Sequence, residues 1–156
     1  MTSRILSLYR TFEARPLGRW LFSRLVCWKA PYFSSIGPRI VSLAPGRGEA
    51  TLRHRRRVSN HLGTVHAIAL CNLAEFLGGL TTEVSIPPSM RWIPRGMSVE
   101  YLKKARGTMR AVATPTEAAG EAGEGHEWPV RVEVFDAAGE MVFRATIRMW
   151  LSPRRT

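Results

Sequence analysis

The chain has 156 residues, of which 45% are apolar and 22% charged, values that fit one globular domain with its own core. No unbroken apolar run approaches the roughly 18 residues that cross a bilayer, and two cysteines exclude a disulfide framework, which favours the reducing cytoplasm. The net charge of +11 is uneven, because residues 1–57 hold twelve Lys and Arg against two acids and the remainder is nearly balanced.

The basic half attracts anionic partners such as lipid surfaces or phosphate groups, while the absence of a recognised motif argues against nucleic-acid binding. Two short amphipathic helices are predicted in its first thirty residues, because apolar residues recur at helical spacing on either side of Pro16. In the second helix the apolar positions are Leu17, Trp20, Leu21, Leu25 and Trp28. This pattern predicts a helix that packs on the domain, with contact to a membrane surface as the alternative. We therefore expect residues 1–30 to be a helical extension and residues 31–156 to be the main domain.

Six strands are predicted in the main domain. Two lie between residues 36 and 57 and are joined at the glycines of residues 45–48, and two more lie in residues 96–115, separated by Gly107. A loop rich in Gly, Ala and Glu covers residues 116–127, and the last two strands form a hairpin in residues 128–153, where Val130, Val132 and Val134 alternate before a turn at residues 136–139. One long helix lies between the first two strands and the last four. The predicted class is α+β, with the sheet packed on that helix.

The long helix contains a carboxylate where one is unexpected. It is predicted from about Val65 to Glu83, with Thr64 as N-cap, and its apolar residues lie on all sides, so the helix should be buried on all sides. Glu75 lies in its middle, on the same stripe as Asn72 and beside Gly78–Gly79, where another backbone could approach. A buried carboxylate costs several kcal/mol unless it is paired or protonated. Glu75 therefore has either a structural partner, such as an arginine, or a chemical role.

The start of this helix favours the chemical role. His66 and the free amides of the first turn lie at the positive end of the helix dipole, where backbone donors can hold a developing oxyanion. Desolvation raises a carboxyl pKa toward the range of a general base or acid. The alternatives are that His66 only caps or packs and that Asn60 only bonds to nearby backbone. His61 and His66 lack the spacing of a metal site, and none is expected.

The sequence from Asn60 to Glu75 resembles the hotdog-fold thioesterases of the phenylacetate-pathway type, within an uncharacterised branch of that superfamily. The resemblance lies in N-x-x-G-x-x-H followed by an acid nine residues after the histidine, here Asn60, Gly63, His66 and Glu75, and it extends over about residues 36–151. It implies a hotdog fold, a sheet wrapped round the helix, assembled as a homodimer or homotetramer with active sites at the subunit interface.

The resemblance also implies roles for single residues and an acyl-CoA substrate. Glu75 matches the general base or nucleophile, the backbone N–H of Ala67 the oxyanion donor, Asn60 the residue that positions substrate or water, and Gly63 the turn glycine. Binding of coenzyme A phosphates is implied for Lys103, Lys104 and Arg106, while His61 and Asn72 are further candidates for substrate contact. Ala67 and Ile68 replace the family's common pair of glycines, which keeps the N–H and narrows the mouth of the site. No cofactor is expected, because coenzyme A enters as part of the substrate.

Two other functions stay open at this point. In hotdog dehydratases and hydratases of 3-hydroxyacyl thioesters a histidine precedes the helix acid by fourteen residues, as His61 precedes Glu75, although the sequence that those enzymes carry between the two is missing. A non-catalytic module that binds acyl-CoA is the other alternative.

Overall fold

The computed structural model describes residues 3–120 and 124–154. Its elements are, in chain order, α1 (Arg4–Glu13), α2 (Gly18–Lys29), the 3-10 helix η1 (Pro31–Ser35), β1 (Arg39–Ala44), β2 (Arg47–Leu52), the 3-10 helix η2 (Arg56–Val58), α3 (Ala67–Ser85), β3 (Met90–Tyr101), β4 (Met109–Pro115), β5 (His126–Phe135) and β6 (Met141–Pro153). The predicted order of two helices, two strands, one long helix and four strands is confirmed. Residues 121–123, within the predicted loop, lie outside the described residues.

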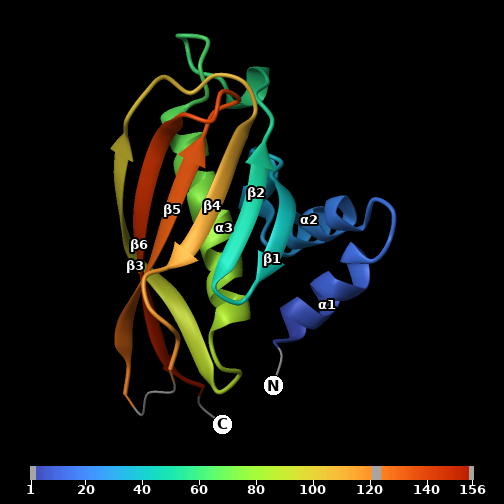
Figure 1. Ribbon diagram of the computed structural model, residues 1–156, viewed down its shortest axis with the longest axis vertical. Helices are drawn as coiled ribbons and strands as arrows, with labels where there is room; N and C mark the ends of the chain where they lie inside the picture. The colour runs from blue at the N-terminus through green and yellow to red at the C-terminus, as the bar shows by residue number, and fades with distance from the viewer. Residues whose placement is uncertain (1–2, 121–123, 155–156) are drawn as a thin grey trace.

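The six strands form one antiparallel sheet in the order β1-β2-β4-β5-β6-β3. The sheet curves around α3 (Figure 1), which confirms the predicted α+β class. Consecutive strands β3 and β4 are not neighbours, because β3 pairs with β6 at the far side of the sheet. Among the described strands, β1 and β3 are therefore the two edges.

Local turn chemistry sets the two predicted hairpins. Gly46 has a φ of 81° between β1 and β2, and Gly139 has a φ of 82° between β5 and β6, values in the left-handed region that glycine adopts without strain. On β5 the alternating valines are buried against α3, while Arg131 and Glu133 lie on the other face of the strand. The alternation of apolar and polar residues along β5 thus matches the alternation of buried and more exposed side chains.

Helix α3 is the centre of the core. Leu73, Ala74 and Leu77 are fully buried. A Cβ on Gly78 would lie 2.6 Å from Ile147 Cδ1, so this glycine lets the sheet approach the helix. Close approach at Gly78–Gly79 was predicted for another backbone, but the groups that approach are side chains, Ile147 at Gly78 and Trp92 at Gly79.

The ends of α3 differ from the prediction at one terminus. The N-cap is His66, not Thr64, and the last residue is Ser85, two positions before Pro87. Within the described chain, α3 is the one helix long and apolar enough to cross a membrane, but 67% of it is buried inside the fold, as for a core helix.

The two N-terminal helices are confirmed, but the predicted packing face of α2 is wrong. Its buried residues are Gly18, Phe22, Ser23 and Cys27, whereas the apolar residues of the predicted packing face, Leu17, Trp20, Leu21, Leu25 and Trp28, are exposed. The side that faces inward carries Phe22, whose ring packs against Tyr9 and Phe12 of α1. It also carries Ser23, whose Oγ accepts the backbone N–H of Ile40 in β1 at 2.8 Å.

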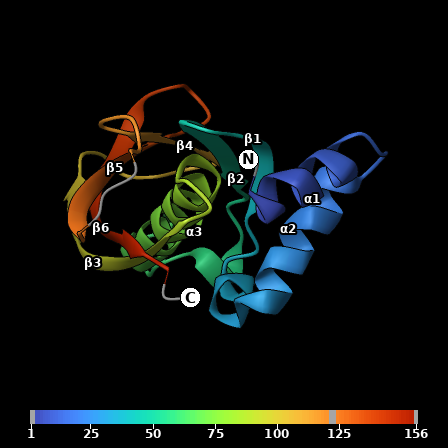
Figure 2. The same ribbon diagram turned by 90° about the horizontal axis from the view of Figure 1, so that it is seen from below.

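The helical extension shares its hydrophobic core with the sheet and α3. Leu6, Tyr9 and Phe22 belong to the same cluster of buried side chains as Leu73 and Phe143. The pair of helices lies beside β1 and β2, on the side away from β3 and β6 (Figure 2). The division of the chain at residue 30 stays a prediction.

Candidate active site

Glu75 lies on the exposed side of α3. The prediction that it is buried is wrong for the single chain, because the sheet and the N-terminal helices leave one stripe of α3, including Ile68 and Glu75, exposed. Its carboxylate makes no hydrogen bond or ion pair with any residue in 3–120 or 124–154. A carboxylate on a mostly buried helix, without a structural partner among the described residues, is free to act on a ligand.

Two cavities meet at Glu75. The larger has a volume of about 550 Å³ and lies between the N-terminal helices and α3. Its walls are mostly apolar, with Ile5, Leu8, Leu25, Val26 and Phe33 on one side and Phe76 and Leu80 on the other. The smaller, about 290 Å³, lies between α3 and β3 and is lined by Pro94, Arg95, Met97 and Ile147. Glu75 therefore separates an apolar chamber from one that contains a guanidinium group.

The first turn of α3 offers the predicted backbone donor. In the described chain the N–H of Ala67 has no acceptor, whereas the N–H of Ile68 donates to His66 Nδ1 at 3.1 Å. A ring nitrogen that accepts carries no proton, so the proton of a neutral His66 lies on Nε2. His66 therefore caps the helix and leaves the Ala67 amide open.

The loop before α3 is organised by Asn60. Its Oδ1 accepts the backbone N–H groups of Leu62 and Thr64 at 3.0 and 3.1 Å, and its Nδ2 donates to Thr64 Oγ1 at 2.9 Å. Gly63 has a φ of 69°, the conformation of a turn glycine. His61 is exposed in the same turn and, like Glu75, has no partner in the described ranges. The side chain of Asn60 is thus committed to the loop that presents Ala67.

The basic segment after β3 lies beside this loop. The carbonyl of Ala105 accepts the N–H of Val65 at 2.8 Å, which fixes Lys104 and Arg106 next to the start of α3. Both are exposed, while Lys103 forms an ion pair with Glu140 at 2.8 Å. Of the three residues predicted to bind phosphate, Lys104 and Arg106 therefore have no ion-pair partner within the described residues.

Asn72, the remaining candidate, makes one polar contact on α3, and Cys71 beside it makes a second contact that was not predicted. Asn72 is buried and donates from Nδ2 to Ser35 Oγ at 3.2 Å, while its Oδ1 is buried without a partner in the described chain. Cys71 Sγ and Tyr101 Oη lie 3.2 Å apart, and this hydrogen bond, with some burial, raises the pKa of Tyr101 to about 12. Neither contact could be predicted from the sequence, nor could the apolar cavity, since all three come from packing between distant segments.

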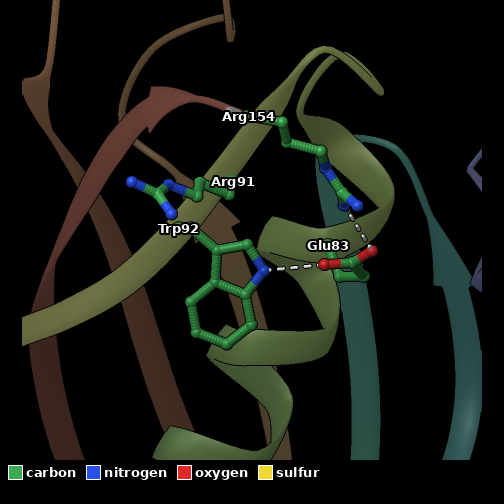
Figure 3. A pocket seen from close by; sticks show the side chains of 4 residues that line it. All are labelled: Glu83, Arg91, Trp92 and Arg154. Atoms are coloured by element: carbon green, nitrogen blue, oxygen red, sulfur yellow. Dashed lines mark hydrogen bonds and ion pairs between the residues drawn. The ribbon is translucent and has the colours of Figure 1, made fainter. Parts of the chain in front are cut away.

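A second glutamate on α3 shows what a structural carboxylate looks like. Glu83 accepts from Trp92 Nε1 at 2.8 Å and lies 3.9 Å from an Arg154 guanidinium nitrogen (Figure 3). These residues and Arg91 line a hollow of about 340 Å³. Glu83 therefore ties the end of α3 to β3 and the C-terminal segment, and Glu75 has no such ties.

The chain does not bring Glu75 and the Ala67 amide together. They are eight residues apart on one helix, which is about 12 Å at 1.5 Å per residue. One carbonyl group cannot contact both groups of the same chain. His61 lies in the turn before α3, on the side of Ala67 and away from Glu75.

Solved structures with the same architecture define the class. The structural-genomics protein APC5556 is 44% identical, with a TM-score of 0.83 over 96% of this chain and 99% of that one. A Pseudomonas aeruginosa protein of unknown function and probable thioesterase, PA5026, is 25% identical, with a TM-score of 0.75 over 85% of this chain and 93% of that one. The Haemophilus influenzae thioesterase HI1161 is 16% identical, with a TM-score of 0.68 over 78% and 82% of the two chains.

The structure is therefore a hotdog fold of the thioesterase superfamily, as the resemblance predicted. Within it, residues 18–151 match the family described as "Domain of unknown function (DUF4442)", and the chain belongs to that family. No curated protein matches the chain significantly in sequence.

Proposed function

We propose that this protein hydrolyses an acyl thioester, with acyl-CoA as substrate and Glu75 as general base or nucleophile. The observation that carries the proposal is the Glu75 carboxylate, which lies at the junction of two cavities and has no partner among the described residues. Support for the reaction type comes from similar structures that are named thioesterases. The two free cysteines agree with a reducing cytoplasm as its location.

The two chambers suggest how such a substrate is divided. An apolar acyl chain suits the cavity between the N-terminal helices and α3, whose walls are mostly hydrocarbon. The thioester carbonyl then lies at Glu75. Lys104 and Arg106 are the candidates for coenzyme A phosphates, with Lys103 available if its exposed ion pair with Glu140 opens.

A homodimer supplies the missing geometry. Strand β3 is a sheet edge of 12 residues, and Ile93 and Tyr101 on it are exposed, features of an edge that pairs with another strand. A two-fold axis beside this edge would set the exposed stripes of two α3 helices side by side and antiparallel. Glu75 of one copy would then lie opposite Ala67 of the other. This arrangement provides both groups to one carbonyl.

The chemistry follows from these groups. As general base, Glu75 takes a proton from water, the hydroxide oxygen bonds to the carbonyl carbon, and the Ala67 N–H stabilises the resulting oxyanion. When the intermediate collapses, the carbon–sulfur bond breaks and the thiolate takes the proton back from Glu75. As nucleophile, the Glu75 carboxylate bonds to the carbonyl carbon and the carbon–sulfur bond breaks, which gives an acyl anhydride and a thiolate. Water then opens the anhydride, which restores the Glu75 carboxylate and releases the proton that the thiolate takes up. Either route yields a carboxylic acid and free coenzyme A.

The direct test is Glu75→Gln, measured as thiol release from a panel of acyl-CoA esters. Because the substitution keeps the shape and removes the base, we expect kcat/KM to fall at least about 100-fold. Glu133→Gln, on the outer face of β5, is the matched control and should retain the wild-type rate. Equal rates for Glu75→Gln and wild type would refute the mechanism.

The same panel separates the alternatives. A dehydratase would change the absorbance of an enoyl thioester without releasing thiol, and His61→Ala would stop it. A binding module would raise its melting temperature with acyl-CoA and turn over neither substrate.

A further inference from the structure

The outward face of α2 is an apolar surface without a cover. One side of the helix carries Leu17, Trp20, Leu21 and Trp28, with Arg24 among them, because each lies three or four residues from another of the set. Trp28 is 78% exposed, Leu17 72% and Leu21 45%, although the opposite side of α2 is packed on β1. Exposed large apolar residues in a contiguous stripe mark a surface that contacts a partner.

A hollow lined by arginines lies beside this stripe. It has a volume of about 420 Å³ between α2, the start of β1 and the segment after β2, and its five basic residues are Arg24, Arg39, Arg53, Arg55 and Arg57. No carboxylate of residues 3–120 or 124–154 pairs with any of the five. The one hydrogen bond of these guanidinium groups that the structure gives is from Arg57 to the Ser34 carbonyl, at 3.4 Å.

The arginines are held close despite their like charges. A Cβ on Gly37 would collide with guanidinium nitrogens of both Arg55 and Arg57, so these two groups gather over the same glycine. Partial desolvation, followed by the charges of Arg57 and Arg53, lowers the pKa of Arg55. Like charges kept together without a counter-charge form a site for an anion, and guanidinium groups suit phosphate oxygens because they donate two parallel hydrogen bonds.

The stripe and the hollow are one continuous surface, because Trp20 and Arg24 belong to both. A second copy of the chain is a poor occupant, since a two-fold contact through this surface would bring one arginine cluster toward the other. An anionic bilayer complements both parts, with the apolar side chains in the interfacial layer and the guanidinium groups on lipid phosphates. We propose that the outward face of α2 and the arginine hollow bind the surface of an anionic lipid bilayer.

The orientation has a consequence for the apolar cavity. Leu25 and Trp28, at the edge of the stripe, also line the cavity that ends at Glu75. The mouth of that cavity then opens next to the bilayer. Binding to the bilayer does not depend on hydrolysis, so this inference stands or falls separately from the proposed function.

The test is flotation of the full chain with vesicles at low and high salt. We expect binding to vesicles of phosphatidylcholine with about one third phosphatidylglycerol, weak binding to phosphatidylcholine alone, and loss of binding in about 1 M salt. A blue shift of tryptophan fluorescence on the anionic vesicles provides a second readout, through Trp20 and Trp28.

Two variants test the two halves of the surface. Arg53→Gln with Arg55→Gln should weaken vesicle binding about tenfold or more, since each basic residue near the surface adds to the attraction. Leu17→Asn with Leu21→Gln should weaken it with all charges kept. The control, Arg91→Gln with Arg131→Gln, removes the same charge from β3 and β5 and should bind as wild type does. Melting curves establish that each variant is folded.

Three results would overturn the inference. The first is that the wild-type protein fails to float with anionic vesicles, or that the Arg53/Arg55 variant floats as well as the wild type does. The second is a wild-type protein that does not bind vesicles but melts at a higher temperature with inorganic phosphate or free coenzyme A. If the arginine variant lacks that stabilisation, the hollow is a site for a soluble phosphate. The third is a wild-type oligomer that dissociates in the Leu17/Leu21 variant, which would assign the surface to a second copy.

Discussion

Helices α2 and α3 both carry apolar residues on most of their turns, yet they differ in how many of these residues the fold buries. The sheet encloses α3 and leaves exposed a stripe that contains Ile68 and Glu75. Helix α2 packs through Phe22, Ser23 and Cys27 and directs Trp20, Leu21 and Trp28 outward. The exposed stripe of α3 carries the candidate base, and the exposed stripe of α2 carries the candidate lipid contact.

An apolar stripe on a helix predicts that this side of the helix contacts another surface, but it does not identify that surface. On α3 the apolar residues surround the helix, so any rotation buries most of them. On α2 the buried side is the one that fits its neighbours, because Phe22 packs on Tyr9 and Phe12 of α1 and Ser23 accepts the Ile40 amide at the sheet edge. The apolar residues left outside are the ones available to a partner.

Leu73→Ala should cause the largest loss of stability. Leu73 is fully buried between α3 and the sheet, and removing its side chain leaves a cavity, so we expect the free energy of unfolding to fall by about 2–5 kcal/mol. Chemical denaturation measures this change in the free energy of unfolding, provided that the m-value is the same for the variant and the wild type. A loss below about 1 kcal/mol would mean that the core around α3 collapses to fill the space.

Gly18→Ala should loosen the helical extension. Gly18 is buried at the start of α2, where a Cβ would overlap with the backbone carbonyl of Phe12 in α1. We expect a loss of about 1–3 kcal/mol, with faster amide exchange in α1 and α2 than in the sheet. Gly120→Ala, which has open space around it, is the control and should change stability little. Uniform exchange throughout the chain would show that the extension and the sheet unfold together.

The attachment of α1 should weaken at high pH through Tyr9. Burial, reinforced by the hydrogen bond to Glu13, raises the pKa of Tyr9 from 10.0 to about 12. The unfolded chain loses this proton first, so the stabilisation is complete below pH 10 and is lost as the pH rises toward 12. Melting temperatures across this range should fall less steeply for Tyr9→Phe than for wild type. Tyr32→Phe, at an exposed position, should follow the wild-type curve.

Leu21→Ala should have the smallest effect. Leu21 is exposed on α2, so the free energy of unfolding should change by no more than about 0.5 kcal/mol. Since Leu73→Ala makes the same chemical change, the pair measures burial alone. A loss above about 2 kcal/mol for Leu21→Ala would show that another copy of the chain covers this face in solution.

Much of the fold can be predicted from the sequence because it depends on local patterns. The alternating valines of β5, Gly46 and Gly139 at the hairpin turns, and the long apolar run of α3 each specify an element from residues that are close in the chain. The candidates Glu75 and Ala67 also come from residues close in the chain, because Glu75 lies nine residues after His66 in the motif that carries the resemblance and Ala67 follows that histidine directly. The pairing of β3 with β6 is not found, since it joins segments some fifty residues apart.

The elements, their order and the place of one carboxylate in an apolar run follow from the sequence. The packing of distant segments settles which face of each helix is covered, that Glu75 is exposed with no partner among the described residues, and that two cavities meet beside it. The physical reason is that periodicity fixes which residues share a face, while burial depends on the surface that distant segments present to it. Ser23 illustrates this, because its role depends on an amide seventeen residues away.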